Sequence, residues 1–322
     1  MMNHKEAFEV LEPGILTTIQ DGGRFGYSQF GVPPSGALDY FSYRVANLLV
    51  NNLENEACLE TMIMGLKLRS LGDFTIAITG ADLTVLLNGE PINMWRTYLL
   101  KRGDTIFFKK LHTGCRAYIS VSGGLAVPKI MGSYSTYLSG RFGGLEGRSL
   151  RRGDILYRFN RSYYLNSLYL KFPENWIPQF NKEVELRVIL GPQDDHFTKD
   201  GLKTFLSSIY EVTPQSDRMG IRLRGPIIER RPEVEESIIS EGLLPGAIQI
   251  PGDGNPIIIL NELVTGGYTK IGSVIFVDLG KVAQVKPGDS IRFRAVSVEE
   301  AHLLLKEQED CLNSFKMKST NL

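Results

Sequence analysis

Short apolar runs separated by turn residues are the feature of this sequence that most restricts its fold. The runs are rich in β-branched and aromatic residues and are bounded by Gly, Pro, Asn or Asp, a pattern typical of strands. They span residues 74–79, 83–87, 105–108, 117–121, 186–190, 257–260 and 274–277. With 33 glycines to supply turns, we expect a mainly β fold of closed or sandwiched sheets.

Three similar turns recur at residues 101–104, 151–154 and 286–289. Each reads basic residue, any residue, Gly, Asp, and each precedes a short apolar strand. Two of them contain Arg-Gly-Asp, which is also an adhesion sequence, but a Gly-Asp pair before a strand is more often a plain turn. The recurrence therefore predicts a repeated β unit rather than a binding tripeptide.

The chain of 322 residues is long enough for two domains with separate cores. We expect one domain over residues 1–165 and another over 183–322, with the junction in the aperiodic stretch 160–182. Helices are expected at 37–53 and, as an amphipathic terminal helix, at 298–315. The terminal helix either closes the second domain or docks a partner, and core packing is favoured.

Charge and cysteine usage exclude several classes of protein. Lys and Arg number 36 and Asp and Glu number 36, so no long-range field favours nucleic acid or an anionic membrane. The three cysteines Cys58, Cys115 and Cys311 are few and widely spaced, which favours a reducing compartment. Because no run of about 18 apolar residues occurs, a cytoplasmic location is expected.

Several common catalytic motifs are missing. The sequence has no Gly-x-x-x-x-Gly-Lys-Ser/Thr loop for a nucleotide, no Cys-x-x-Cys pair and no His pair with zinc-helix spacing. We therefore expect no metal site. Residues 194–196, Asp-Asp-His, are compatible with a divalent ion or a general base, but a solvated loop is favoured because neighbouring strand residues point oppositely.

Polar side chains among glycines and prolines mark a candidate site in the first half. Residues 17–24 and 31–39 combine stiff backbone with side chains that bind small polar ligands. The candidates are Asp21, Arg24, Ser35 and Asp39, with Asn47 following in the predicted helix.

A second polar cluster occurs at residues 216–223. Arg218 and Arg222 suit carboxylate or phosphate recognition, or alternatively pair with Glu229 or Glu233. Further on, Gln249 precedes the turn formed by Thr265, Gly266, Gly267 and Tyr268, where consecutive glycines let backbone N–H groups approach a ligand.

Taken in order, these segments resemble the carboxyltransferase family that includes the second subunit of allophanate hydrolase, KipA and the C subunit of bacterial 5-oxoprolinase. The resemblance runs from about residue 8 to 293. It rests on residues 13–14, 17–24, 31–39, 44, 46–47, 59–60, 79–81, 122–124, 132–133, 143–148, 216–223, 246–251 and 265–268. Tyr134, and the stretch Asn261 to Val264, depart from the usual pattern.

The resemblance implies two tandem cyclophilin-like β-barrel domains and partnership with a KipI-like subunit and a LamB/YcsF-like subunit. It further implies ATP-dependent hydrolysis of 5-oxoproline to glutamate, with ATP possibly held by a partner. Two alternatives remain: a urea or amide carboxyltransferase served by carboxybiotin on another chain, and a non-catalytic antagonist of a KipI-like kinase inhibitor. No biotin is expected on this chain, because Lys316-Met317-Lys318 lacks the usual Ala-Met-Lys-Met context.

Under the oxoprolinase hypothesis, the candidate residues take two kinds of role. The substrate-binding candidates are Asp21, Ser35, Asn47, Thr265, Gly266 and Gly267. The catalytic candidates, which bind the carboxylate or a phosphate or position water, are Arg24, Asp39, Arg218, Gln249 and Tyr268.

Overall fold

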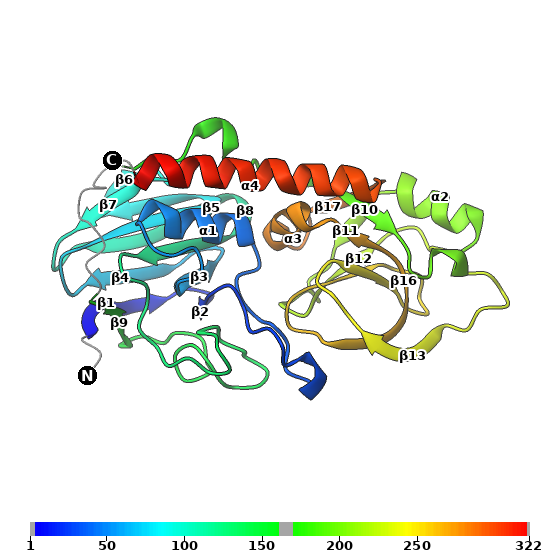
Figure 1. The fold of residues 1–322 in the computed structure, drawn as a ribbon, viewed down its shortest axis with the longest axis horizontal. Coiled ribbons are helices and arrows are strands. Elements are labelled where there is room, and N and C mark those ends of the chain that lie inside the picture. Colours follow the sequence, from blue (N-terminus) through cyan, green and yellow to red (C-terminus); the bar gives the residue numbers. More distant parts are fainter. Residues whose placement is uncertain (1–3, 161–169, 321–322) are drawn as a thin grey trace. The chain divides into compact units, whose positions relative to one another are not determined.

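The computed structural model describes residues 4–160 and 170–320, which form two compact units (Figure 1). The first unit comprises Met1–Arg24, Ser35–Phe180 and Glu309–Leu322, and the second comprises Phe25–Pro34 and Asn181–Gln308. Apart from two short segments, the chain passes from the first unit to the second at residues 180–181. Phe25–Pro34 belongs to the second unit although it lies early in the sequence, and Glu309–Leu322 belongs to the first although it lies last. Each unit is described by itself below.

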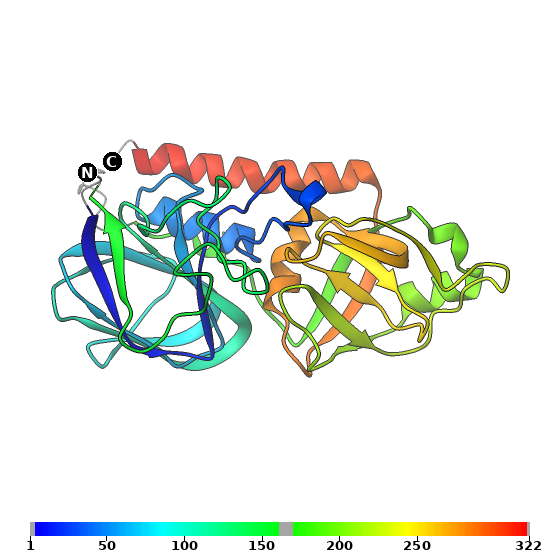
Figure 2. The ribbon, with the colours of Figure 1, turned by 90° about the horizontal axis from the view of Figure 1, so that it is seen from below.

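The first unit is built on a nine-stranded antiparallel sheet that curves into a half-barrel (Figure 2). Its order is β2-β3-β8-β4-β1-β9, and β5 pairs with β6, β7 and β8. The strands are β1 His4–Pro13, β2 Leu16–Gln20, β3 Cys58–Met62, β4 Leu66–Ser70, β5 Phe74–Leu87, β6 Glu90–Ile92, β7 Thr97–Leu100, β8 Thr105–Val121 and β9 Ile155–Phe159.

Two long strands replace four of the predicted short ones. The runs 74–79 and 83–87 belong to β5, and the runs 105–108 and 117–121 belong to β8. The ladder between β5 and β8 shifts register on both sides of Asp82. Such β-bulges break the alternation of side chains and bend the strand, so one curved strand has the sequence pattern of two.

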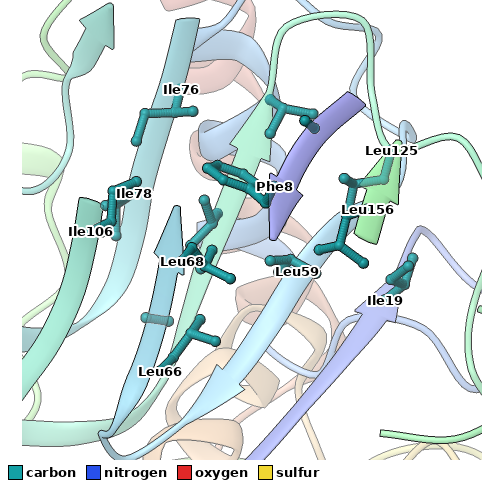
Figure 3. Close-up of a cluster of buried hydrophobic side chains, with 14 of the residues drawn as sticks. Phe8, Ile19, Leu59, Leu66, Leu68, Ile76, Ile78, Ile106, Leu125 and Leu156 are labelled. Atoms are coloured by element: carbon teal, nitrogen blue, oxygen red, sulfur yellow. The ribbon is translucent and has the colours of Figure 1, made fainter. Parts of the chain in front are cut away.

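The core of the first unit fills the concave face of this sheet (Figure 3). Phe8, Leu59, Leu68 and Ile76 are fully buried in one cluster, in which the Phe8 and Phe74 rings meet edge to face at 5.1 Å. Burying each such side chain contributes about 1.5–3 kcal/mol relative to leaving it exposed. This packing supplies the rigid platform on which the polar loops lie.

Two helices cover the first unit. The predicted helix 37–53 is α1 Tyr40–Leu49, and its apolar side chains join a buried cluster with Trp95 and Phe172. The predicted terminal helix is α4 Val298–Thr320. Its last turns pack on the first unit, where the Phe315 and Phe172 rings lie 5.0 Å apart and Cys311 is buried. The Lys316 ammonium also lies 3.1 Å from a Glu54 carboxylate oxygen.

The second unit is a closed seven-stranded barrel. The order β10-β17-β11-β12-β15-β14-β16 is completed by pairing of β10 with β16, and β13 extends from β16. The elements are β10 Glu183–Leu190, α2 Lys199–Ser207, β11 Tyr210–Val212, β12 Gly220–Arg224, β13 Ser237–Gly242, β14 Ala247–Ile250, β15 Ile257–Ile259, β16 Thr265–Val274, α3 Leu279–Gln284 and β17 Ser290–Ala295. The 3-10 helices are η1 Ser28–Phe30, η2 Glu174–Trp176, η3 Asp194–His196 and η4 Phe276–Asp278.

The strand predicted at 274–277 is wrong, because β16 ends at Val274 and the chain turns into η4. Contacts of Asp278 stabilise this turn. Its carboxylate is fully buried and accepts two hydrogen bonds from the Arg187 guanidinium, at 2.9 and 2.7 Å, and one from the Arg187 backbone N–H at 2.9 Å. An apolar run alone carries no signal of so specific a contact.

The three Gly-Asp sequences are plain turns, as predicted. In each, the aspartate carboxylate accepts a hydrogen bond from the backbone N–H three residues earlier, from Lys101 at 2.7 Å, Arg151 at 2.7 Å and Lys286 at 3.0 Å. The glycine that precedes each aspartate has a positive φ, which glycine adopts without strain.

The mainly β fold with few helices is therefore confirmed. Within residues 4–160 and 170–320, no helix combines the length and apolar character needed to cross a bilayer.

Candidate functional site

Asp21 lies at the end of β2 and organises a glycine-rich segment far along the chain. Its buried carboxylate accepts hydrogen bonds from the Ser133 hydroxyl at 2.6 Å, from the backbone N–H of Tyr134 at 2.6 Å and from the Ser135 hydroxyl. It also closes its own loop by accepting from the N–H of Gly23 at 2.9 Å. A carboxylate with this many donors is held in one orientation.

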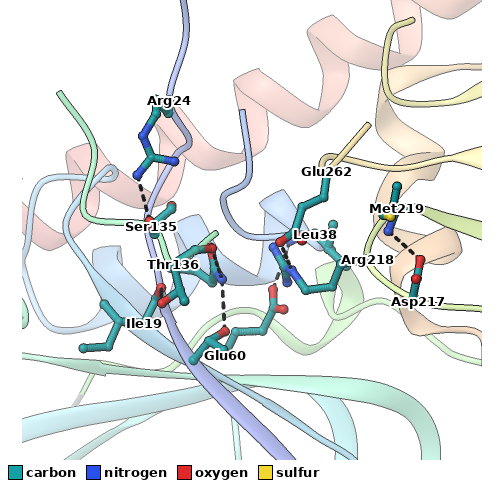
Figure 4. Close-up of polar contacts among 12 residues, drawn as sticks. Ile19, Arg24, Leu38, Glu60, Ser135, Thr136, Asp217, Arg218, Met219 and Glu262 are labelled. Carbon is teal, nitrogen blue, oxygen red and sulfur yellow. Dashed lines mark hydrogen bonds and ion pairs between the residues drawn. The ribbon is translucent and has the colours of Figure 1, made fainter. Parts of the chain in front are cut away.

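Arg24 binds the same segment from the other end of the loop (Figure 4). Its side chain is 1% exposed, and it donates from Nε to the carbonyl of Ile130 at 3.0 Å and from Nη2 to that of Ser135 at 2.8 Å. The guanidinium carbon lies 4.9 Å from the centroid of the Phe142 ring. Asp21 and Arg24 together fix residues 130–142.

Ser35 and Asp39 lie beside this loop. A Cβ added to Gly36 would come within 2.9 Å of the Gly23 backbone, and the N–H of Ala37 donates to the carbonyl of Asp21 at 2.9 Å. Ser35 is buried with φ +52°. The structure therefore brings Asp21, Arg24, Ser35 and Asp39 into one compact loop cluster of the first unit.

Asp39 caps α1 and continues a buried polar chain. Its carboxylate accepts from the N–H of Ser42 at 3.0 Å, while its own N–H donates to the Tyr118 hydroxyl at 2.8 Å. That hydroxyl in turn donates to the Glu60 carboxylate at 2.8 Å, and the Arg116 Nε lies 3.9 Å from the other Glu60 oxygen. Burial raises the pKa of Tyr118 well above its ordinary value, so the phenol keeps its proton as a donor.

Sequence reasoning did not assign a role to Glu60, Arg116 or Tyr118. The signal available was that Glu60 and Arg116 are charged residues inside strands whose neighbours are apolar. Buried charges of this kind occur in pairs or hydrogen-bonded networks.

Asn47 lies about two turns further along α1 and links three elements. Its amide nitrogen donates to the carbonyl of Glu56 at 2.9 Å, and its oxygen accepts from Asn52 at 3.0 Å and from the Ser120 hydroxyl at 2.9 Å. Both the nitrogen and the oxygen of the side-chain amide are therefore hydrogen-bonded. In this structure Asn47 joins α1 to β8 and to the loop before β3.

In the second unit, Arg218 forms a buried ion pair with Glu262. The Arg218 Nε lies 2.5 Å from a Glu262 carboxylate oxygen, with side chains 5% and 3% exposed. Arg218 thus contacts Glu262, a residue that sequence reasoning had noted without assigning it a role, and Arg222 is exposed on β12. Figure 4 shows this pair and the adjacent turn, where the N–H of Met219 donates to Asp217 at 2.7 Å.

Gln249 and the Gly-Gly-Tyr segment lie on neighbouring strands of the same barrel. The Gln249 amide donates to the carbonyl of Tyr268 at 3.3 Å, and a Cβ on Gly266 would lie 2.5 Å from that amide nitrogen. The Tyr268 side chain is 43% exposed. Thr265, Gly266 and Gly267 all belong to β16, so the barrel positions this polar edge rigidly.

A second polar group that sequence reasoning missed lies beside Gln249. Lys270, opposite Gln249 in the ladder, forms an ion pair with Glu241, which also accepts from Gln193 at 2.8 Å. The Lys270 hydrogen bond lowers the pKa of Glu241 below its ordinary value. The candidates Arg218, Gln249 and Tyr268 thus occur in a barrel with further charged pairs.

Residues 194–196 form η3. In the parts of the chain that the structure describes, no three His, Cys, Asp or Glu side chains are grouped so as to hold a metal ion.

Comparison with known proteins identifies the family. Residues 30–295 match the family described as carboxyltransferase domain, subdomain A and B. The chain belongs to this family. It is 36% identical over 316 residues to the C subunit of 5-oxoprolinase from Escherichia coli, covering 98% of both chains.

Other members of the family are much longer proteins. The chain is 37% identical over 328 residues to urea amidolyase of Saccharomyces cerevisiae, covering 96% of this chain but 18% of that protein. The crystal structure of the K. lactis urea amidolyase matches with a TM-score of 0.88 at 33% identity, over 96% of this chain and 20% of the other. This carboxyltransferase-family chain therefore spans about a fifth of the urea amidolyases, and their fold agrees with the mainly β architecture described above.

Proposed function

We propose that this carboxyltransferase-family chain is the C subunit of an ATP-dependent 5-oxoprolinase, which hydrolyses 5-oxoproline to glutamate together with KipI-like and LamB/YcsF-like subunits. One observation carries the proposal: the match to the C subunit of 5-oxoprolinase extends over 98% of both chains. The urea amidolyases match over only about a fifth of their length. The rest of those proteins is not aligned with this chain.

The chemistry of the reaction gives the polar loops specific tasks. A lactam is stabilised by resonance, so its carbonyl oxygen needs activation by ATP before water attacks. Negative charge develops on this oxygen during the attack. Among the proposed catalytic residues, Tyr268 is the one whose side chain is substantially exposed, and we assign it direct contact with the substrate. Gln249 positions Tyr268 through its backbone carbonyl.

The remaining candidates act mainly by positioning. Arg24 and Asp39 bind backbone groups of the first unit, and Arg218 forms its ion pair with Glu262. We assign ATP to a partner subunit, and carbonyl activation to the assembled complex rather than to this chain alone.

The test is reconstitution of the purified chain with its partner subunits, ATP and 5-oxoproline, with glutamate and ADP measured together. Tyr268→Phe is expected to lower kcat/KM about ten- to a hundredfold, because one hydrogen bond to a charged group contributes about 1.5–3 kcal/mol. Tyr157→Phe is the matched control, since Tyr157 is equally exposed at 43%. An intact assembly that forms no glutamate contradicts the proposal.

A second function is favoured by the urea amidolyase matches: carboxyl transfer to urea or a related amide, with carboxybiotin on another chain. The discriminating assay adds a biotin carboxylase, a biotinylated carrier, bicarbonate and urea in place of the oxoprolinase partners. Urea-dependent ATP turnover would favour this function. A stable complex with a KipI-like protein but no turnover in either mixture would instead favour an antagonist of a kinase inhibitor.

A further inference from the structure

The first unit contains a cavity that none of the candidate site residues lines. Its volume is about 420 Å³, and it lies between the bulged part of β5 and β8, the connection from β6 to β7 and residues 171–180. Small-molecule pockets are typically about 300–1,000 Å³. The cavity therefore has the size of a metabolite site.

Backbone pairing places Arg96 at one wall of this cavity. The N–H of Thr97 donates to the carbonyl of Leu170 at 3.0 Å and the N–H of Phe172 to that of Trp95 at 2.9 Å, so Arg96 and Lys171 lie opposite each other. Like charges held this way repel unless anions accompany them.

The two cations differ in their partners. Lys171 donates to a Glu174 carboxylate oxygen at 2.5 Å. The Arg96 Nε is shielded from solvent, and within residues 4–160 and 170–320 this nitrogen has no hydrogen-bond partner, although Glu174 also interacts electrostatically with Arg96. A shielded guanidinium nitrogen without a partner is unfavourable in the empty protein, and an anion in the cavity would relieve it.

The exposed carboxylate of Asp82 lines the cavity from β5. Asp82 lies where the ladder to β8 shifts register on both sides, opposite Thr113. Bulges of this kind re-aim a side chain away from the sheet pattern. In the described part of the chain, no hydrogen bond or ion pair engages the Asp82 carboxylate. The cavity is thus lined by a guanidinium whose Nε lacks a hydrogen bond and by an exposed carboxylate without a hydrogen bond or ion pair among the described residues.

We propose that this cavity binds a small zwitterion of the amino-acid class, with its carboxylate on Arg96 and its ammonium group toward Asp82. An arginine fork matches a carboxylate with two parallel hydrogen bonds. Asn93 and Gln179 also line the cavity, and their amides suit a polar ligand side chain. A ligand with a single charge makes only one of these two contacts, so the site discriminates against it.

The test uses Trp95, which lines the cavity, as a fluorescence reporter in the isolated chain without ATP. The sequence has two tryptophans, so in the Trp176→Phe variant the fluorescence comes from Trp95 alone. Calorimetry on the unmodified chain checks the dissociation constants. The probes are L-asparagine, succinamate, which lacks its ammonium group, and 3-aminopropanamide, which lacks its carboxylate. Saturable binding of L-asparagine, about tenfold tighter than either analogue, is expected.

Two variants test which group recognises which charge. Arg96→Gln is expected to abolish the preference for L-asparagine over 3-aminopropanamide, and Asp82→Asn the preference over succinamate. Arg152→Gln, at an exposed turn, is the matched control and should change neither preference. Absence of saturable L-asparagine binding, or equal weakening of all three probes by Arg96→Gln, would overturn the proposal. Because no partner subunit or turnover enters the measurement, its failure is distinct from failure of the proposed function.

Discussion

Replacing Asp21 by asparagine separates an anchoring role from a substrate-binding role. The asparagine oxygen can replace Oδ1, but the new amide NH₂ then faces the N–H of Tyr134, which now donates to Oδ2 at 2.6 Å. That bond is lost and a buried donor is left facing another donor. The bonds from Ser133 and Gly23 survive only as neutral ones, which are weaker.

The size of the effect follows from these contacts. Losing one bond to a charged group costs about 1.5–3 kcal/mol, and weakening the other bonds adds a comparable amount, giving about 3–5 kcal/mol in total. Because the chain has two units, global unfolding need not be two-state. We therefore expect the loss as a lower opening free energy of the Tyr134 amide, measured by hydrogen exchange.

Asp195→Asn is the matched control, because Asp195 is exposed and its change should be within about 0.5 kcal/mol. Normal protection of the Tyr134 amide in Asp21→Asn, together with lost turnover in the reconstituted assembly, would refute the anchoring argument. Asp21 would then act on substrate directly.

Three further substitutions test other contacts. Burial raises the pKa of Asp278, but hydrogen bonds from Arg187 outweigh this effect and hold the pKa below its ordinary value. The carboxylate therefore stabilises the folded protein at neutral pH, and this stabilisation is lost as the pH falls below about 4. In urea unfolding, Asp278→Asn should lower the free energy of unfolding more at pH 7 than at pH 3. Gly147→Ala places a Cβ 2.0 Å from the Arg141 carbonyl carbon at φ +66° and should destabilise the first unit by about 3 kcal/mol in thermal unfolding. Arg218→Met leaves Glu262 buried without its partner, and should cost the second unit about 3–5 kcal/mol in urea unfolding.

Control variants isolate the cause for Gly147→Ala and Arg218→Met, and the comparison of two pH values does so for Asp278→Asn. Gly153→Ala has a similar φ of +88° but nothing within 4 Å of the added Cβ, so only backbone strain of about 1–2 kcal/mol is expected. The double variant Arg218→Met with Glu262→Leu removes both charges and should recover most of the loss. Equal effects of Gly147→Ala and Gly153→Ala, an undiminished loss in the double variant, or a deficit for Asp278→Asn that does not change with pH would contradict the respective arguments.

Local patterns were sufficient to predict much of the fold. The Gly-Asp turns are closed by hydrogen bonds over three residues. The spacing of apolar residues that identifies α1 and α4 is likewise a local pattern, although both helices pack on residues remote in sequence. The long strands were divided in two because bulges beside Asp82 interrupt the alternation that identifies a strand. The false strand at 274–277 arose for the opposite reason, since its apolar residues give no sign of the Arg187 contact to Asp278.

The candidate site was harder to predict because its contacts are remote in sequence. The composition of residues 17–24 indicated a polar loop, but three of the four donors to the Asp21 carboxylate lie 112 or more residues away. Likewise Arg218 pairs with Glu262, 44 residues on. Residue type predicts that a buried charge needs a partner, whereas only the folded chain determines which residue supplies it.

The backbone of residues 130–148 explains why polar anchors are needed there. This segment forms no named strand or helix, and positive φ angles occur at non-glycine residues Met131, Arg141 and Glu146. Such conformations persist only where the surroundings over-determine them. Asp21 and Arg24 supply that constraint from the loop that follows β2. The hydrogen bonds of these two buried charges therefore stabilise the strained backbone of the segment. A ligand site that uses this segment would inherit its rigidity from the two anchors, and under the proposed function we expect them to act on substrate only indirectly.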